Sequence, residues 1–303
     1  MTIKECRNLY KKELQSVSST PLLDVDVLLC FFLSCDKTHL LLNDNQEIDE
    51  NVLIGFLNAI ENRKKGIPIA YIINKKSFYG YDFYVDSSVL IPKPDTETLV
   101  EKAVVLISEK IKKNESILTI CDMCSGSGCI AISVLLSLVN DFHVPYNKLP
   151  KIILVDISKK ALDVSRKNAE LLLDSRLNER VRFLQSNLFE MVPYKFDVIL
   201  TNPPYVPHFM VEELLKDGRS EPRLALDGDV DEFGNYSTSI DGLSLIKRFI
   251  VEADAHLAPY GFMLMETGEY NAEGAENFGH KNYFKTKIYK DINNQLRVVQ
   301  FEK

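Results

Sequence analysis

The stretch from Phe196 to Tyr205, FDVILTNPPY, constrains the fold of this 303-residue chain more than any other. Its apolar, β-branched first half predicts a buried strand, and two prolines, which lack a backbone N–H, end that strand directly after Asn202. In an open α/β sheet, ligands bind where such strands end. Asn202 offers an amide there, and the carbonyls of Asn202 and Pro203 lie outside any strand ladder. Together with the flat ring of Tyr205, these oxygens suit a planar group that carries an NH2.

The motif formed by Asn202, Pro203, Pro204 and Tyr205 permits two interpretations. Asn-Pro opens many turns, so a single such pair predicts only a loop. The full motif resembles the signature of S-adenosylmethionine-dependent methyltransferases that modify amide or exocyclic amino nitrogens. The rest of the chain has to indicate whether a cofactor site accompanies the motif, and which nitrogen is the substrate.

The composition is that of a globular protein without an export signal or a membrane span. Hydrophobic residues make up 46% of the chain and charged residues 26%, and no apolar run is long enough to cross a bilayer. The first five residues show no signal-peptide pattern. We therefore expect a cytoplasmic protein whose six cysteines are reduced thiols. Cys121 and Cys124 are expected to bind no metal, because no second pair of ligands lies nearby in the sequence.

The charge balance limits the partners. A formal net charge of −7 and a pI near 5.4 argue against duplex binding driven by phosphate neutralisation. We expect no direct nucleic-acid binding and no membrane attachment. The basic clusters at 63–65 and 75–76 are interpreted as solvated loops.

Residues 1–74 are expected to form a small helical bundle. Apolar residues recur at helical spacing over 3–17, and Thr20-Pro21 is a helix start signal. A second helix over 22–32 is apolar nearly all round, and another over 50–60 precedes a glycine. Core packing explains these residues, and a bundle of this size beside a catalytic domain also suits a module that recognises a partner.

Residues 75–94 are expected to form a β-hairpin linker and a proline strut, which leaves 95–303 as the main domain. β-branched and aromatic residues predict strands over 69–73, 78–85 and 89–91. In Pro92-Lys93-Pro94 the alternating prolines hold the chain extended. Asp95 is expected to cap the following helix, with Glu97 in its first turn.

A strand, a glycine loop and a helix follow the strut. Residues 116–122 predict a buried strand and residues 130–139 a helix. Between them, glycines allow a ligand to approach the backbone closely, and the helix start presents free N–H groups. The pattern does not match the dinucleotide fingerprint Gly-x-Gly-x-x-Gly. The loop consists of Cys124, Ser125, Gly126, Ser127 and Gly128.

Polar residues also follow the next two predicted strands. The strand over 151–156 ends in Asp156, whose carboxylate can cap the next helix or accept hydrogen bonds from both hydroxyls of a ribose, and the preceding glycine loop favours ribose. The strand over 181–186 leads to Asn187 and Leu188, which can bond the amino group of an adenine and contact its face. The glycine loop, Asp156, Asn187 and Asn202 all follow strand ends, so one adenosyl group could contact all of them, and Asn202 is a candidate cofactor-binding residue as well.

Over almost its whole length the chain is similar to one family, the peptide chain release factor N5-glutamine methyltransferases (the PrmC/HemK family). The proline strut discriminates best, because nucleic-acid methyltransferases share the glycine loop and Asn-Pro-Pro-Tyr but not the strut. A similar family that modifies a glutamine of a ribosomal protein usually has a different strut. Asp95-Thr96-Glu97 therefore favours release factors as the substrate. The similar stretches are 68–72, 89–97, 122–128 with 156–158, 202–205, and 221–226 with 241–243.

The resemblance implies an α/β fold, in which a seven-stranded, Rossmann-like S-adenosylmethionine-dependent methyltransferase domain follows a helical bundle and a β-hairpin linker. It implies methylation of the side-chain amide nitrogen of the glutamine in the Gly-Gly-Gln motif of release factors, the proteins of translation termination. By position, 124–128 would hold the methionine part of the cofactor, Asp156 the ribose and Asn187 with Leu188 the adenine. Asn202 to Tyr205 would hold the glutamine amide.

The chain departs from the family pattern at three positions. Cys124 replaces a glycine, Lys93 an arginine and Asn187 an acid. An amide at position 187 can still accept a hydrogen bond from an amino group.

Alternative functions stay open. An adenine-N6 nucleic-acid methyltransferase would flip a base onto Tyr205, although the net charge and the strut argue against it. A non-catalytic binding protein on a decayed methyltransferase fold would account for Cys124. His208 is expected to lie in a solvated loop and not to act as a base. Residues 230–239 are polar and turn-rich and are expected to be mobile.

Overall fold

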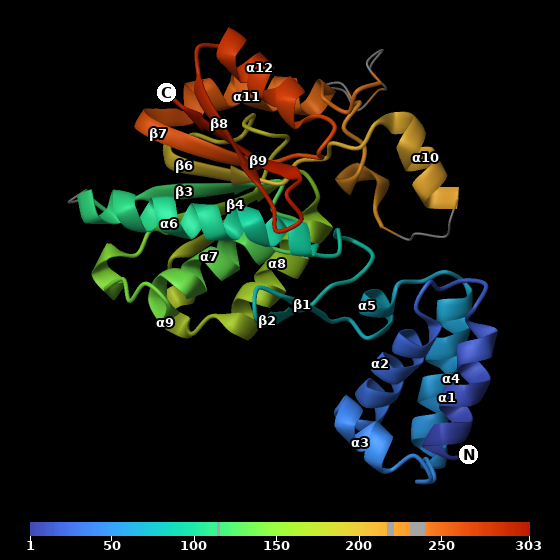
Figure 1. The fold of residues 1–303 in the computed structure, drawn as a ribbon. Coiled ribbons are helices and arrows are strands. Elements are labelled where there is room, and N and C mark those ends of the chain that lie inside the picture. The colour runs from blue at the N-terminus through green and yellow to red at the C-terminus, as the bar shows by residue number, and fades with distance from the viewer. Residues whose placement is uncertain (114–115, 217–220, 231–234, 236–239) are drawn as a thin grey trace. The chain divides into compact units, whose positions relative to one another are not determined.

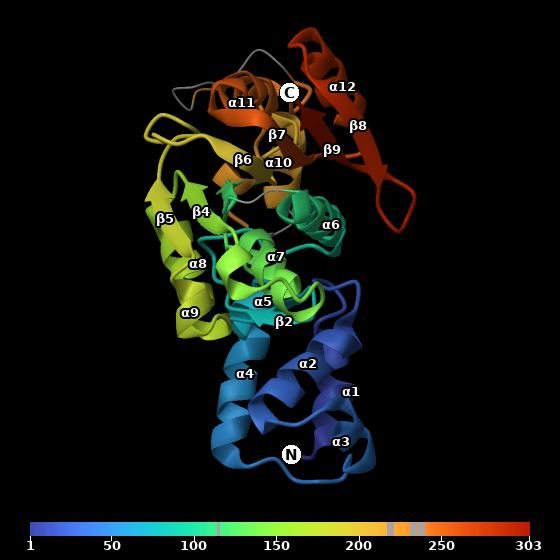
Figure 2. The same cartoon turned by 90° about the vertical axis from the view of Figure 1, so that its left-hand side faces the viewer.

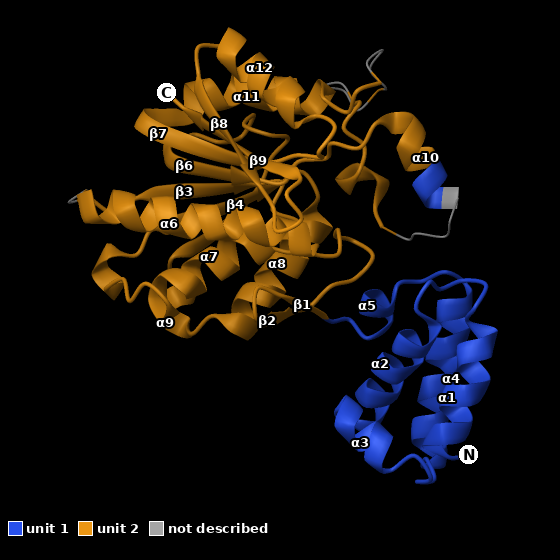
Figure 3. Cartoon of the chain, in the orientation of Figure 1, with its two compact units in different colours: residues 1–75, 213–220 blue, residues 76–212, 221–303 orange. Residues whose placement is uncertain are grey.

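The computed structural model describes residues 1–113, 116–216, 221–230, 235 and 240–303. The chain forms two compact units, one of residues 1–75 and 213–220 and one of 76–212 and 221–303 (Figure 3). The division into a helical bundle of residues 1–74, a linker of residues 75–94 and a main domain of residues 95–303 stays a prediction. The segment expected to be mobile, 230–239, lies outside the described residues except for Val230 and Asn235.

The first unit contains the predicted bundle of helices. Thr2 and Glu5 form a capping box at the start of the first helix, and Asp36 and Asp49 cap the third and fourth. The buried apolar faces of the helices meet in one core. The helices are α1 (Ile3–Glu13), α2 (Pro21–Leu33), α3 (Lys37–Leu42), α4 (Glu50–Lys64) and α5 (Ile69–Ile72).

Two predictions for this unit were wrong. Residues 69–73 were expected as a strand, but α5 forms there because its isoleucines pack against the bundle core, and that burial outweighs β propensity. The cluster at 63–65 was interpreted as a solvated loop. Arg63 and Lys64 instead form the last turn of α4, where Arg63 Nε lies 2.7 Å from Asp24 Oδ2 with 16% of its side chain exposed.

The second unit is built on a seven-stranded sheet of order β5-β4-β3-β6-β7-β9-β8 (Figure 1). The first five strands in this order are parallel, and β9 runs antiparallel to both of its neighbours. The strand order therefore reverses between β3 and β6. The strands are β3 (Thr119–Met123), β4 (Lys151–Asp156), β5 (Val181–Gln185), β6 (Phe196–Thr201), β7 (Leu257–Glu266), β8 (Lys285–Lys290) and β9 (Leu296–Glu302).

Helices cover both faces of this sheet, which confirms the predicted methyltransferase-type α/β fold. The first three helices of the unit, α6, α7 and α8, pack on one face, and α11 and α12 pack on the other (Figure 2). The helices are α6 (Glu97–Lys113), α7 (Cys129–Asn140), α8 (Lys159–Leu172), α9 (Ser175–Asn178), α10 (His208–Lys216), α11 (Ser244–His256) and α12 (Ala272–Lys281). Short 3-10 turns are η1 (Pro94–Thr96), η2 (Tyr146–Lys148) and η3 (Arg223–Ala225).

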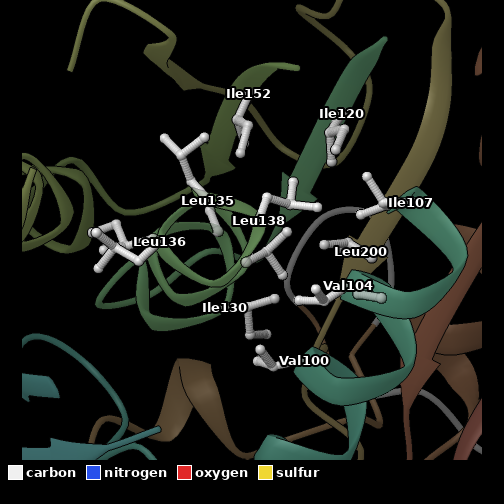
Figure 4. Packing of buried hydrophobic residues seen from close by; sticks show 14 of the residues in the cluster. Val100, Val104, Ile107, Ile120, Ile130, Leu135, Leu136, Leu138, Ile152 and Leu200 are labelled. Carbon is white, nitrogen blue, oxygen red and sulfur yellow. The ribbon is translucent and has the colours of Figure 1, made fainter. Parts of the chain in front are cut away.

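The core follows from strand periodicity. Successive side chains of a strand point to opposite faces, so Leu200 of β6 joins the core under α6 and α7 while Ile199 joins the core under α11. Figure 4 shows the first of these cores, in which side chains of α6 and α7 meet those of three strands. Residues labelled there are Val100, Val104, Ile107, Ile120, Ile130, Leu135, Leu136, Leu138, Ile152 and Leu200.

The hairpin and the strut differ in part from expectation. β1 (Lys76–Phe78) and β2 (Tyr81–Phe83) form the predicted hairpin, but 89–91 is not a strand. The backbone N–H of Ile91 donates instead to Glu221 Oε1 at 3.2 Å. Asp95 does not cap α6, because it lies inside η1 and its carboxylate lies 3.2 Å from the Arg297 guanidinium.

Two further findings complete the fold. All six cysteines are free thiols. In the part of the chain that the structure describes, no helix has the length and apolarity that a membrane span requires.

The buried side chain of Asn168 in α8 ties two loops together. Its Oδ1 accepts from the backbone N–H of Tyr84 at 2.7 Å, and its Nδ2 donates to the carbonyls of Tyr84 and Ser127, both at 2.9 Å. Tyr84 follows the hairpin and Ser127 belongs to the glycine loop. One amide therefore satisfies three backbone groups that would otherwise lose their hydrogen bonds inside the protein.

We predict that Asn168→Ala lowers the free energy of unfolding by about 2–4 kcal/mol, because three backbone groups lose their partner. Urea denaturation followed by circular dichroism measures this, since the chain has no tryptophan. The matched control is Asn140→Ala, which removes one exposed 3.1 Å bond to Tyr81 Oη and should cost less than about 0.5 kcal/mol. Equal losses in the two variants would contradict the prediction.

Candidate functional site

A cavity of about 320 Å³ lies at the carboxyl ends of the central strands of the second unit. This is the position at which the strand order reverses, where doubly wound sheets bind ligands. The volume is in the range of small-molecule sites. Its lining includes most of the predicted site residues, namely Cys124, Ser125, Gly126, Ser127, Asp156, Asn187, Leu188, Asn202 and Pro204.

Three predicted site residues do not line the cavity: Gly128, Pro203 and Tyr205. Gly128 is the N-cap of α7 with φ of +77°, and a Cβ there would lie 3.0 Å from a methyl group of Leu154. The glycine at this position therefore permits close packing of the helix on β4. Its two neighbours in the chain, Ser127 and Cys129, do line the cavity.

Cys124 adopts a conformation that usually requires glycine, with φ of +58°. Its thiol lies in the wall of the cavity, and burial raises the pKa of this thiol far above its ordinary value. The side chain is therefore an uncharged, weakly polar part of the wall and has no thiolate character.

The carboxylate of Asp156 lies at the end of β4 and faces the cavity. Its Oδ2 accepts from the N–H of Gly126 at 2.9 Å and its Oδ1 from the N–H of Ser158 at 2.8 Å. Burial raises the pKa of Asp156, while these backbone bonds lower it. The side chain that caps α8 is that of Ser158, which accepts from Ala161 N at 3.2 Å. Each Asp156 oxygen keeps a second lone pair for a ligand hydroxyl.

The amide of Asn187 is oriented by a neighbouring acid. Its Nδ2 donates to Glu190 Oε1 at 2.7 Å, and the Arg248 guanidinium lies 3.4 Å from the same oxygen. This arrangement leaves Asn187 Oδ1 as an acceptor, which is what an adenine amino group needs. Leu188 and Arg248 line the cavity beside it.

Asn202 follows β6 and is oriented in a similar way. Its Nδ2 donates to Thr96 Oγ1 at 3.3 Å, and among the described residues its Oδ1 has no hydrogen-bond partner. The Tyr205 ring lies behind this wall, with Oη donating to Glu266 Oε1 at 3.3 Å. Asn271 Nδ2 donates to the Tyr205 carbonyl at 2.9 Å. The wall thus presents an amide oxygen, whereas the aromatic ring packs behind it.

The proline strut is held by specific side-chain contacts. Lys93 Nζ lies 2.7 Å from Oε1 of the buried Glu221, and Thr96 accepts from Asn202. Lysine thus keeps a cation at a position where the family usually has arginine. Pro92, Lys93 and Thr96 all line the cavity, so the strut forms part of its wall.

The prediction that His208 lies in a solvated loop was wrong. His208 begins α10, its Nδ1 lies 2.6 Å from Asp227 Oδ2, and its backbone N–H donates to Asp229 Oδ2 at 3.2 Å. Both aspartates are buried. His208 does not line the cavity and instead joins the segment after the Asn-Pro-Pro-Tyr motif to the segment around 227–229.

Sequence reasoning missed several residues of the cavity wall. Most of them have apolar side chains, and no motif or spacing in the sequence indicates that they belong to a site. The sequence did contain one signal, the similarity of residues 89–97 and 221–226 to the family. The similarity of a whole stretch, however, assigns no role to its individual residues. The missed lining residues include Val89, Leu90, Ile157, Leu224, Ala225, Leu245 and Arg248.

Comparisons with known proteins agree with this geometry. The family model "PrmC N-terminal domain" matches residues 5–73 and the model "Methyltransferase small domain" matches 97–221. The catalytic domain of hMettl16, solved with the MAT2A 3'UTR hairpin 6, shares the fold with a TM-score of 0.51 at 10% identity, over 84% of this chain and 82% of that one.

Curated relatives match over nearly the full length. The release factor glutamine methyltransferase of Clostridium acetobutylicum is 33% identical, over 91% of this chain and 89% of the relative. Relatives of the same name from Koribacter versatilis and Buchnera aphidicola are 31% and 30% identical, and the matches cover 98% and 100% of those proteins and 99% and 100% of this chain. The chain therefore belongs to the family of release factor glutamine methyltransferases.

Proposed function

We propose that this protein transfers the methyl group of S-adenosylmethionine to the side-chain amide nitrogen of the glutamine in the Gly-Gly-Gln motif of peptide chain release factors. The observation that carries the proposal is the cavity at the strand-order reversal, whose wall combines Asn202 with the glycine loop and Asp156. The full-length similarity to relatives named for this activity supports the choice of substrate. Release factors as partners favour a cytoplasmic location.

The lining fits the cofactor. Residues 124–127 would hold its methionine part, Asp156 the ribose hydroxyls, and Asn187 with Leu188 the adenine. The fit rests on the free acceptor positions of Asp156 and Asn187 and on the close approach that the glycine loop allows. When bound, S-adenosylmethionine supplies a sulfonium methyl group that is already activated for transfer.

The chain itself mainly has to align the substrate. An amide nitrogen is a poor nucleophile because its lone pair is delocalised, and correct alignment can lower such a barrier by ~7–11 kcal/mol. Asn202 Oδ1 would accept an N–H bond of the substrate amide. This oxygen would hold the nitrogen toward the methyl group and stabilise the positive charge that grows on it.

The competing activity is adenine-N6 methylation of nucleic acid. The net charge of −7 argues against it, as does the position of the Tyr205 ring behind the cavity wall instead of in it. Incubation with labelled S-adenosylmethionine, release factor and nucleic acid together, followed by mass-spectrometric location of the label, tests both. The proposal expects label on the Gly-Gly-Gln glutamine. Label on nucleic acid alone, or on a ribosomal protein instead of the release factor, would refute it.

We predict that Asn202→Ala lowers kcat on purified release factor by at least about 100-fold, because the amide loses an acceptor that aligns it. Cofactor affinity, measured by calorimetry, should stay within about threefold of wild type, since the adenosyl contacts are elsewhere in the cavity. Turnover like that of wild type would remove Asn202 from the mechanism.

We predict the opposite pattern for Asp156→Asn. One acceptor of the ribose hydroxyls becomes a donor, so the Kd for S-adenosylmethionine should rise about 10–100-fold. Turnover at saturating cofactor should change much less. Asp163→Asn is the matched control, because Asp163 is exposed, pairs with Arg166 in α8 and does not line the cavity. Unchanged affinity in Asp156→Asn would exclude the ribose role.

A further inference from the structure

A buried carboxylate lies behind the residues that wall the cavity at Asn202. Glu266 ends β7, next to the end of β6, and is 1% exposed. It does not line the cavity, so it cannot touch a ligand there. Its Oε1 accepts from Tyr205 Oη at 3.3 Å, while its Oε2 has no hydrogen-bond partner within the described chain. A buried carboxylate oxygen without a partner is costly, which calls for an explanation.

Thr96 connects this carboxylate to the cavity wall. Thr96 is 2% exposed, and its Oγ1 accepts from Asn202 Nδ2 at 3.3 Å. A hydroxyl that accepts a hydrogen bond still has its own hydrogen to donate. Thr96 is also the first of the groups that lower the pKa of Glu266. The free hydrogen of this hydroxyl and the unpartnered Oε2 of Glu266 therefore complement each other.

We propose that Thr96 and Glu266 are positioning residues of the methyl transfer. The ionised Glu266 carboxylate holds the hydroxyls of Thr96 and Tyr205, and Thr96 in turn holds Asn202 with its amide oxygen toward the cavity. The proposal rests on the role of Asn202 in the proposed function. It goes further because it states what keeps that amide in the orientation that can accept a substrate NH2.

The orientation matters because the two ends of an asparagine amide have almost the same size. Without an acceptor at Thr96, the Asn202 amide can turn over and present its own NH2 to the cavity. Two NH2 groups then face each other, which leaves the substrate amide without its acceptor. Displacement of an aligned group costs rate even when the cofactor remains bound.

The charge on Glu266 is set by groups on several elements. Burial and, to a smaller extent, Asp95 in η1 raise the pKa of Glu266. The hydroxyl of Thr96, the guanidinium of Arg297 on β9 and the hydroxyl of Tyr205 lower it, and the resulting pKa is about 7. The Cys129 thiol on α7 also lies within the field of this carboxylate. Below pH 7 the carboxyl carries its own hydrogen and no longer accepts from both hydroxyls. The kcat should therefore rise as the pH increases through about 7.

The first test uses three threonine variants of the full chain. Thr96→Val keeps the shape but removes the acceptor, and it should lower kcat about 10–100-fold with the Kd for S-adenosylmethionine within about twofold. Thr96→Ser should restore most of the rate. Thr98→Val is the control, because Thr98 is also buried near the start of α6 but does not line the cavity. Wild-type kcat in Thr96→Val, or an equal loss in Thr98→Val, would overturn the proposal.

The second test uses Glu266→Gln, with its fold checked by circular dichroism. Its kcat should be lower and its pH profile should lack the rise near 7. A wild-type profile in Glu266→Gln would overturn the proposal.

A third readout does not depend on turnover. The side-chain NH2 signals of Asn202 in 15N-asparagine-labelled protein, identified by their loss in Asn202→Ala, should shift in Thr96→Val and not in Thr98→Val. Unchanged signals in Thr96→Val would overturn the positioning proposal. If wild type fails to methylate release factors, the proposed function fails, whereas this NMR result still decides the hydrogen-bond arrangement.

Discussion

The site depends on the parallel pairing of β6 with β3. In this register Met123 lies opposite Thr201, so the next residues on the two strands, Cys124 and Asn202, leave the sheet side by side. The strand order reverses at the same place, because β4 and β5 follow on one side and β7 on the other. The glycine loop and the Asn202 amide therefore line one cavity. A shift of one residue in this register would turn every side chain of β6 to the opposite face.

Side chains from distant parts of the chain then hold the loops around this crevice. Lys93 reaches Glu221, and Arg297 of β9 reaches Asp95 in η1. The buried Asn168 fixes the backbone behind the glycine loop. In each of these contacts at least one group, namely Glu221, Arg297 or Asn168, is buried and requires a partner. Such contacts therefore define the geometry more sharply than apolar packing alone. The same logic applies to Thr96 and Glu266 behind Asn202.

The sequence predicted the central strands well, because residues 151–156 and 196–201 are β-branched runs with a clear polar or proline end. It also named nine of the residues that line the cavity. Residues 69–73 and 89–91 have the same composition, but their apolar side chains pack against a helical core or line the cavity without a strand partner. The contacts of His208 and Arg297 join residues far apart in the chain, and neither motif nor periodicity predicts them.

The most direct test of the account is a crystal structure of the protein with S-adenosylhomocysteine and a peptide that contains Gly-Gly-Gln. The account predicts ribose hydroxyls on Asp156, and the glutamine NH2 donating to Asn202 Oδ1 with its nitrogen directed toward the sulfur. A cofactor product bound outside this cavity, or a glutamine amide held without Asn202, would contradict it.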